Sequence, residues 1–364
     1  MRMIFPILMM VAIFGANIYV LYRIWQILPF GTFFKVIVVL LYLACFAGVF
    51  LGFGGGFEKM SLKTASVVYE VSDTWLIFFL YAFIGFIALD ILKAVHLFPK
   101  ALLKDSFWGS LLVFGSLAAL LYMGNLHYKD KIKEEMTIKT GKTLDRPLRI
   151  LFASDLHLGY HNRKDELSRW VDIMNSEKPD LILIGGDIID ISARPLVEGD
   201  YASELRRLEA PVYAVLGNHE YYSGDSAARK FYSDAGIHLL RDETVSLMGI
   251  NVVGRDDRTN RSRKDLPSLM EEVDLSRFTI LLDHQPSGLE EAQENKVDFQ
   301  FSGHTHRGQV WPISWVTDMI FEDSWGPYQK GDTKYYVSSG LGIWGAKIRI
   351  GTRSEYLVLD VEGE

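Results

Sequence analysis

The chain has 364 residues, of which 49% are hydrophobic, and a formal net charge of -7. The negative charge argues against a nucleic-acid-binding protein, because such binding needs a basic face. The single cysteine, Cys45, excludes an intrachain disulfide, so nothing in the cysteine content marks an oxidising compartment.

Four apolar stretches in the first third of the chain are long enough to cross a bilayer, which takes about 20 residues each. They run near Ile4–Tyr22, Val36–Phe53, Trp75–Leu92 and Trp108–Leu126. A cleaved signal peptide would account for only the first of them. We therefore expect a four-helix transmembrane domain over residues 1–127, in contact with the lipid bilayer.

An even number of spans places the N-terminus and the C-terminal part on the same side of the membrane. The distribution of Lys and Arg slightly favours the cytoplasmic side for both. Asp90, near the end of the third span, has Lys93 one turn later. It is either half of an interfacial ion pair or an ion or proton site. A transporter would need polar residues along several spans, and these spans carry almost none.

Residues 128–147 are charged, and we expect a juxtamembrane helix and linker there. Residues 148–364 alternate short apolar runs, typical of buried strands, with helix-like stretches such as Glu166–Ser176 and Asp225–Ala235. The strand-like runs are Leu148–Ala153, Leu181–Ile184, Val212–Leu216, Ile250–Gly254, Phe278–Leu282, Phe299–Phe301, Tyr335–Ser338 and Tyr356–Val361. This pattern predicts an α/β domain with two packed sheets flanked by helices.

Residues able to bind metal follow five of these runs, most of them beside a glycine. They are Asp155-Leu156-His157, Gly186-Asp187, Gly217-Asn218-His219-Glu220, His284 and Gly303-His304-Thr305-His306. Open α/β sheets place their sites just past the carboxyl ends of the strands, so these residues are expected to converge.

Carboxylate, amide and imidazole ligands together suit Mn, Fe, Zn or Co. A pair of such ions needs a shared carboxylate, and the lone Asp187 is the natural choice. Two divalent ions activate water, orient a phosphate and neutralise charge developing on its oxygens. A histidine that binds no metal can protonate the leaving oxygen. The sequence therefore predicts metal-assisted hydrolysis of a phosphate ester.

From about Arg149 to Asp360 the chain resembles the calcineurin-like metallophosphoesterase superfamily. It resembles in particular the bacterial membrane-associated branch that includes some UDP-2,3-diacylglucosamine pyrophosphohydrolases. The resemblance implies a four-layer αββα sandwich with two mixed sheets over residues 148–364. It also implies a dinuclear site, and makes a bacterial inner-membrane enzyme of lipid A biosynthesis the leading expectation.

The same resemblance implies a role for each site residue. The first metal is held by Asp155, His157 and His306, Asp187 bridges, and the second metal is held by Asn218, His284 and His304. His219 matches the histidine that contacts the phosphate or protonates the leaving group. Glu220 would orient or tune His219.

Arg307 departs from the pattern, because many relatives have glycine after Gly-His-Thr-His. Its guanidinium either grips a second phosphate of the substrate or points outward from the surface. Other positions also stay open between two interpretations. His161 lines the pocket or lies in a surface loop, and Arg349 and Arg353 contact phosphate or are ordinary strand residues. Residues 311–325 form a hairpin capping the sheet or a surface touching bilayer or acyl chain.

We therefore expect a membrane-anchored, dinuclear phosphohydrolase that cleaves a phosphodiester or pyrophosphate bond. A lipid-linked substrate, with UDP-2,3-diacylglucosamine the leading candidate, fits the four-helix anchor. The alternatives are a phosphodiesterase for a soluble substrate and a non-enzymatic membrane scaffold or sensor that keeps the fold. The sequence fixes neither the metal nor the oligomeric state.

Overall fold

A computed structural model describes residues 4–52 and 55–363. The chain divides into two compact units. The first comprises Met1–Leu126 with Gly345–Ile348, and the second comprises His127–Trp344 with Arg349–Glu364.

Four long helices make up most of the first unit: α1 (Ile4–Ile27), α2 (Thr32–Val49), α3 (Leu62–Ala94) and α4 (Phe107–Lys129). Short helical turns, η2 (Phe57–Lys59) and η3 (Lys100–Leu103), lie between them. All four long helices are long and apolar enough to cross a bilayer. The expected end of the second span at Phe53 lies outside the described residues. The chain is therefore a membrane protein with a four-helix anchor.

Asp90 makes a different contact from the one expected. Its carboxylate pairs with Arg23 of α1 at 3.1 Å and accepts a hydrogen bond from the Tyr19 hydroxyl at 2.6 Å. Asp90 thus joins α3 to α1 through Arg23 instead of pairing with Lys93 on its own helix. Such pairing inside the unit lowers the cost of an ionisable group in an apolar segment.

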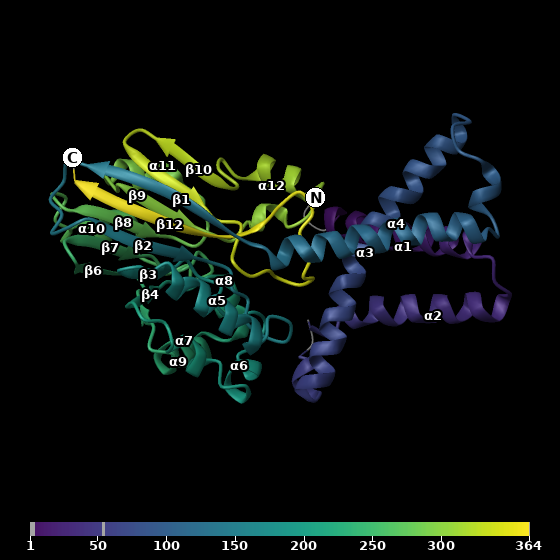
Figure 1. The fold of residues 1–364 in the computed structure, drawn as a ribbon, viewed down its shortest axis with the longest axis horizontal. Helices are drawn as coiled ribbons and strands as arrows, with labels where there is room; N and C mark the ends of the chain where they lie inside the picture. Colours follow the sequence, from purple (N-terminus) through teal and green to yellow (C-terminus); the bar gives the residue numbers. More distant parts are fainter. Residues whose placement is uncertain (1–3, 53–54, 364) are drawn as a thin grey trace. The chain divides into compact units, whose positions relative to one another are not determined.

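The second unit contains two six-stranded sheets (Figure 1). The first has the order β1 (Lys131–Thr140), β12 (Ser354–Gly363), β2 (Leu148–Ala153), β3 (Leu181–Ile184), β4 (Val212–Ala214) and β5 (His238–Leu239). The second has the order β10 (Gly326–Lys330), β11 (Thr333–Val337), β9 (Phe299–Ser302), β8 (Phe278–Leu282), β7 (Ile250–Gly254) and β6 (Glu243–Leu247). Both sheets mix parallel and antiparallel pairs.

The two sheets bury their facing sides against each other. Along β2, Ile150 and Phe152 belong to the core between the sheets, whereas Leu151 and Ala153 belong to the core under the helices. The Phe152 ring lies 5.3 Å from that of Phe299, centroid to centroid. This alternation follows from the two-residue period of a strand, and it explains why strands buried on both faces read as continuous apolar runs.

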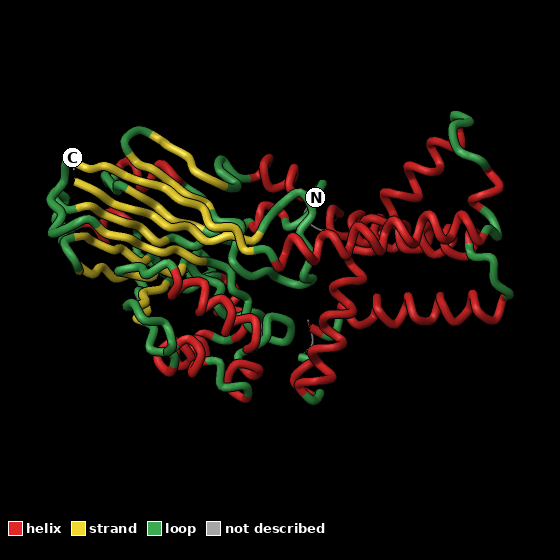
Figure 2. Tube along the Cα trace, viewed as in Figure 1, coloured by secondary structure: helices red, strands yellow, loops and turns green. Residues whose placement is uncertain are grey.

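Helices cover both outer faces (Figure 2). On the first sheet lie α5 (Lys164–Ser176), α6 (Arg194–Glu198), α7 (Ala202–Leu205), α8 (Asn218–Ser223) and α9 (Asp225–Asp234). On the second lie α10 (Leu266–Met270) and α11 (Leu289–Glu294). The expected four-layer αββα architecture is confirmed.

Two expected elements are wrong. The linker expected over residues 128–147 contains β1, which pairs in parallel with β12 along its whole length (Figure 1). An edge strand exposes one side to water, so its charges hid the alternation of Ile132, Met136 and Ile138. The hairpin considered for residues 311–325 is instead α12 (Ile313–Ile320), preceded by the turn η4 (His306–Gly308).

Candidate metal centre

The order of the strands brings the predicted ligands together. Strands β2, β3 and β4 run parallel, so their carboxyl ends meet at one edge, and β8 and β9 do the same in the second sheet. Asp155, Asp187 and Asn218 follow the three strands of the first sheet. His284 and His304 follow the two strands of the second. Parallel pairing within each sheet therefore gathers residues that are far apart in sequence.

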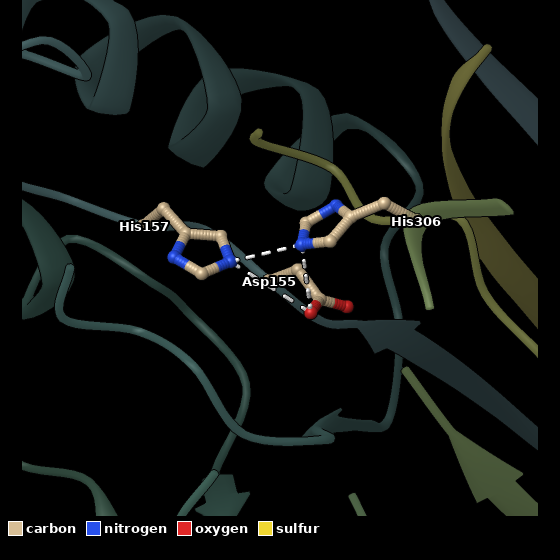
Figure 3. Close-up of side chains that lie close together, drawn as sticks. All are labelled: Asp155, His157 and His306. Atoms are coloured by element: carbon tan, nitrogen blue, oxygen red, sulfur yellow. Dashed lines mark hydrogen bonds and ion pairs between the residues drawn. The ribbon is translucent and has the colours of Figure 1, made fainter. Parts of the chain in front are cut away.

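Asp155, His157 and His306 form one buried cluster (Figure 3). The Nε2 atoms of His157 and His306 lie 3.0 Å apart, and His306 Nε2 lies 3.4 Å from Asp155 Oδ1. Both imidazoles and the carboxylate point toward one another (Figure 3). One carboxylate and two imidazoles facing a common point form a donor set that borderline divalent ions prefer.

Asp187, His284 and His304 form a second cluster. His284 Nε2 lies 3.2 Å from Asp187 Oδ2, and His304 Nδ1 lies 2.8 Å from the side-chain oxygen of Asn218. The other ring nitrogen of His284, Nδ1, is 2.7 Å from the Gly185 carbonyl oxygen. Nδ1 donates its proton to that carbonyl, so Nε2 is the atom that faces the cluster. Burial lowers the pKa of His284, but Asp187 outweighs this and raises it well above its usual range, so Nε2 would release a proton on binding a metal.

The Asp187 carboxylate lies between the two clusters. Its Oδ2 atom is 3.7 Å from His157 Nε2 on one side and 3.2 Å from His284 Nε2 on the other. Its Oδ1 atom accepts the backbone amide of His219 at 2.9 Å, which fixes its orientation. Of the residues predicted as ligands, Asp187 is the one placed to serve both groups.

The backbone at the ligands is strained. Five of them have positive φ angles: Asp155 (55°), His157 (45°), Asp187 (52°), His304 (70°) and His306 (48°). A left-handed conformation costs a residue with a Cβ about 1–2 kcal/mol. Such strain is typical of functional sites, where the surrounding fold holds it in place.

Two glycines make room for the carboxylates. A Cβ atom on Gly217 would lie 2.1 Å from Asp187 Oδ1, and one on Gly303 would lie 2.3 Å from Asp155 Oδ2. Neither glycine has a positive φ, so close approach and not backbone conformation requires them. The glycines beside the ligands therefore let two carboxylates sit against the backbone.

His219 has Asp190 as its carboxylate neighbour. His219 Nδ1 lies 3.3 Å from Asp190 Oδ1, and Asp190 is fully buried. Burial lowers the pKa of His219, but Asp187 and Asp190 outweigh this effect and raise it to about 9. The side chain is thus held through Nδ1, and its other ring nitrogen stays available for contact with a substrate.

Glu220 binds backbone amides of the ligand loops. Its buried carboxylate accepts the backbone amides of Gly217 at 2.7 Å, Ile189 at 2.9 Å and Asp187 at 3.1 Å. It therefore caps α8 and ties the loop after β3 to the loop after β4. The carboxylate that contacts the His219 imidazole is Asp190. Against the effect of burial, Asp187, Asp190 and the charge of Glu220 together raise the pKa of His219, so Glu220 tunes this imidazole and Asp190 supplies the orienting contact.

Asp190 was missed in the sequence, although a signal was present. It follows Asp187 by three residues, in Gly186-Asp187-Ile188-Ile189-Asp190. Its carboxylate also lies 3.4 Å from His157 Nδ1 and 3.7 Å from His161 Nδ1. A second carboxylate so close to a ligand-bearing turn is a candidate partner for histidines. Isoleucines on both sides of Asp190 also indicate that its side chain is buried.

The charges at the site suit divalent cations. Burial raises the pKa of Asp187, but His284 and His219 outweigh this and hold it well below its usual range. Burial, together with the charge of His284, lowers the pKa of His304 to about 4, so this imidazole is neutral. Anionic carboxylates and neutral imidazoles are the forms that bind metal. The clustered residues can therefore hold two metal ions.

Arg307 has no carboxylate partner among the residues that the structure describes. Its guanidinium stacks on the Trp325 ring, 4.3 Å from Cζ to the ring centroid, and the buried Nε atom makes no hydrogen bond. A cavity of about 240 Å³ lies beside it. The cavity is lined by Arg307, Trp325, Ser339, Gly351, Thr352 and Arg353. Arg307 is thus half-buried at the border of this cavity, stacked on Trp325.

Three other candidates have structural contacts. The His161 ring is fully buried, 2.7 Å from the Ile343 carbonyl oxygen, so the surface-loop interpretation is wrong. Arg349 is fully buried and donates to the carbonyl oxygens of His306 and Ser339. Arg353 pairs with Glu134 at 2.7 Å and Glu355 at 3.2 Å. Arg349 therefore supports the loop that carries His306, and only Arg353 also borders the cavity.

Comparison with known proteins identifies the family. Residues 148–308 match the family model described as calcineurin-like phosphoesterase. A metallophosphoesterase of Helicobacter pylori (strain J99) is 34% identical over 59% of this chain and 60% of its own length. The chain thus spans less than two thirds of that relative. A Campylobacter jejuni metallophosphoesterase is 29% identical over 97% of this chain and 96% of its own.

A metallophosphoesterase of Aquifex aeolicus is 32% identical over 64% of this chain and 92% of its own length. This match covers nearly the whole length of the relative. The two-sheet fold and the clusters of Asp and His agree with it and with the family model. The chain belongs to the calcineurin-like metallophosphoesterase family.

Proposed function

We propose that this protein is a membrane-anchored, dinuclear metal-dependent phosphohydrolase that cleaves a phosphodiester or pyrophosphate bond. The observation that carries the proposal is the position of Asp187 Oδ2 between His157 and His284. In this proposal Asp155, His157 and His306 hold one ion, Asn218, His284 and His304 hold the other, and Asp187 joins them. Bound divalent ions would polarise the phosphoryl group and lower the pKa of water.

His219 is the proposed proton donor to the leaving oxygen. Its Nδ1 atom faces Asp190 at 3.3 Å, so a proton on Nδ1 is held and the ring cannot rotate freely. The opposite nitrogen is then free to give its proton to the leaving group, and Asp190 stabilises the cationic imidazole before transfer. Glu220 accepts backbone amides from both ligand loops, and its charge adds to those of Asp187 and Asp190 in favouring the protonated imidazole.

Arg307 is the proposed contact for a second anionic group of the substrate. Within residues 4–52 and 55–363 its guanidinium has no carboxylate partner, and it borders the cavity that Trp325 and Arg353 also line. A planar guanidinium with free donors binds phosphate in a bidentate manner. A substrate with two phosphates, or with a phosphodiester and a further anion, would occupy both places.

The four-helix anchor supports a substrate that resides in the membrane. We propose a lipid-linked pyrophosphate or phosphodiester, with UDP-2,3-diacylglucosamine the leading candidate, and hence a role in lipid A biosynthesis. The catalytic unit would then lie on the cytoplasmic side of a bacterial inner membrane. Manganese is the first metal to test. Fe, Zn and Co are tested next, because the mixed ligand set accepts them as well.

The test of hydrolysis uses the full chain in detergent, stripped of metal and reloaded with Mn(II). Bis-p-nitrophenyl phosphate is the substrate, Asp187→Asn the variant and Asp332→Asn, at an exposed position, the matched control. We expect hydrolysis by wild type and by the control, and a loss of about 10²-fold or more in Asp187→Asn. Equal rates in wild type and Asp187→Asn would overturn the proposal.

The substrate class is tested with the same preparations on a bacterial lipid extract, followed by mass spectrometry. Wild type should deplete a lipid carrying a phosphodiester or pyrophosphate, and His219→Ala should leave it intact. Turnover of bis-p-nitrophenyl phosphate without change in any lipid would favour a soluble substrate instead.

A further inference from the structure

Helix α12 presents its apolar face to the outside of the catalytic unit. Trp311 and five residues of the helix are exposed, to these fractions: Trp311 39%, Ile313 41%, Trp315 59%, Val316 46%, Met319 77% and Ile320 68%. At 100° per residue the five helix positions fall on one side. We call these six residues the α12 apolar face.

The opposite side of the helix is polar, and of its members Ser314 is buried, Thr317 is half-buried and Asp318 is exposed. Ser314 is buried, at 7% exposure, and its carbonyl oxygen accepts the Thr317 hydroxyl at 2.8 Å. The Asp318 carboxylate accepts a hydrogen bond from the Ser324 hydroxyl. A surface helix in water normally buries its apolar side, whereas α12 leaves its apolar side exposed and buries only the polar Ser314.

We propose that the α12 apolar face docks onto the surface of the lipid bilayer. The same chain carries four helices able to cross a membrane, so a bilayer is always within reach of the catalytic unit. The eight residues of α12 extend about 12 Å, far less than the ~30 Å hydrocarbon core, so the helix lies along the interface and does not span it.

The aromatic content of the face fits this partner. The Trp311 and Trp315 rings pack edge to face, with centroids 5.4 Å apart, and both are exposed. Tryptophan favours the headgroup region, where its apolar ring and polar N–H both find suitable surroundings. Met319 and Ile320, the most exposed members, would then reach the acyl chains, as in interfacial helices.

Docking has a consequence for the metal centre, and this consequence alone rests on the proposed function. Phe321 follows α12 directly, and its ring lies 6.2 Å, centroid to centroid, from the His304 imidazole. Trp311 is separated from His306 by only four residues. A helix lying on the bilayer would therefore hold the metal ligands close to the headgroups, with Phe321 linking α12 to His304. A lipid-linked phosphate resides in the same headgroup region.

The test measures lipid contact without any substrate, so it does not depend on catalysis. Cys45 is first replaced by Ala, because it is the only native cysteine. Ile320→Cys and Val197→Cys are then made in the full chain and labelled with the fluorophore NBD. Val197 is the matched control, since it is an exposed aliphatic residue of α6 at 67% against 68% for Ile320. Circular dichroism of each labelled protein checks that it is folded.

The labelled proteins are placed in phosphatidylcholine–phosphatidylglycerol vesicles, with and without lipids that carry a doxyl quencher. We expect NBD at position 320 to be blue-shifted and quenched about tenfold more strongly than at 197, because interfacial helices bury about 5–10 Å into the boundary. Met319→Cys should behave like Ile320→Cys. Equal, aqueous spectra at 320 and 197 would overturn the proposal. A blue shift that resists the lipid quencher and grows with protein density would also overturn it, in favour of a second copy of the chain.

Discussion

Asp190 Oδ1 lies 3.3 Å from His219 Nδ1, and this buried contact sets the orientation of the proposed proton donor. We expect His219→Ala to lower kcat by about 10²–10⁴-fold, the usual contribution of a general acid. Asp190→Asn should lower kcat by about 10–100-fold and change the pH profile, because the imidazolium loses its anionic partner. Asp190 also lies 3.4 Å from Nδ1 of His157, so its substitution can weaken the metal site as well. Once saturating metal removes that second effect, the double variant should be no slower than His219→Ala alone. Steady-state kinetics at saturating Mn(II) measure all three, and a further loss in the double variant would contradict the pairing.

Glu220→Gln provides the contrast. Glutamine offers one acceptor oxygen where Glu220 uses both of its own, and its NH₂ group would face a backbone N–H. A buried group left without a partner costs about 1–3 kcal/mol, so the variant should unfold at lower temperature. Its pH–rate profile should keep the wild-type shape. A changed shape at wild-type stability would restore Glu220 as the orienting partner of His219.

Gly217→Ala should displace the Asp187 carboxylate. The added Cβ would lie 2.1 Å from Asp187 Oδ1, although φ at Gly217 is ordinary for alanine. We expect weaker metal binding, by at least about tenfold, and a matching loss of activity. Gly363→Ala, where nothing lies within 4 Å of the added carbon, is the control. Unchanged Mn(II) affinity in Gly217→Ala would show that Asp187 is not needed in its observed place.

Arg307→Ala should raise KM for substrates that carry a second anionic group and leave KM unchanged for those that do not. We expect KM to rise about 10–100-fold for a pyrophosphate-containing substrate, since a charge-assisted hydrogen bond contributes about 1.5–3 kcal/mol. Bis-p-nitrophenyl phosphate has no second phosphate, so its KM should not change. Arg307→Lys should recover only part of the loss, because an ammonium cannot bind in a bidentate manner. An equal rise in KM for both substrates would place Arg307 at the scissile phosphate.

Asp323 should make stability depend on pH. Burial raises the pKa of this carboxyl from 3.8 to about 6, so the folded chain holds its proton more tightly than the unfolded chain does. Stability contributed by the protonated form is complete below pH 3.8 and is lost as pH rises through about 6. Asp323→Asn should therefore stabilise the fold by about 1–3 kcal/mol at pH 7.5 and by little at pH 4. The substituted Oδ1 atom can still accept the Trp325 amide.

Thermal unfolding of the full chain from pH 4 to pH 8 measures this effect. Asp332→Asn, at an exposed position, is the control and should follow the wild type. A stabilisation by Asp323→Asn that is as large at pH 4 as at pH 7.5 would show that the gain comes from packing and not from the lost charge.

The ligand-bearing strands could be predicted because both of their faces are buried. Strands β3 and β8, which precede Asp187 and His284, have the bounds expected from their apolar runs, and every residue in them is buried. Elements with one solvent-exposed face were harder to predict. The charges of the edge strand β1 favour a linker, and the exposed apolar side of α12 leaves a hairpin and a lipid-contacting surface both open for residues 311–325.

The site was predictable in its ligands and not in its supports. Residue types and their positions past strand ends predicted that these groups converge, and the family resemblance then implied which seven of them are ligands. The structure brings the seven together. The partner of His219 depends on where a side chain points after a strained turn, and Asp187 has a φ of 52°. Glu220, adjacent in sequence, caps a helix instead, and Asp190 arrives from the neighbouring loop.

The most direct test of the central claim is the metal content of the folded, full-length protein. Inductively coupled plasma mass spectrometry after incubation with Mn(II) and removal of free metal should find about two ions per chain in wild type and in His219→Ala. Asp187→Asn should retain at most one, because its carboxylate lies between both clusters. Less than one ion in folded wild type with Mn, Fe, Zn or Co, or two ions kept by Asp187→Asn, would contradict a dinuclear centre joined by Asp187.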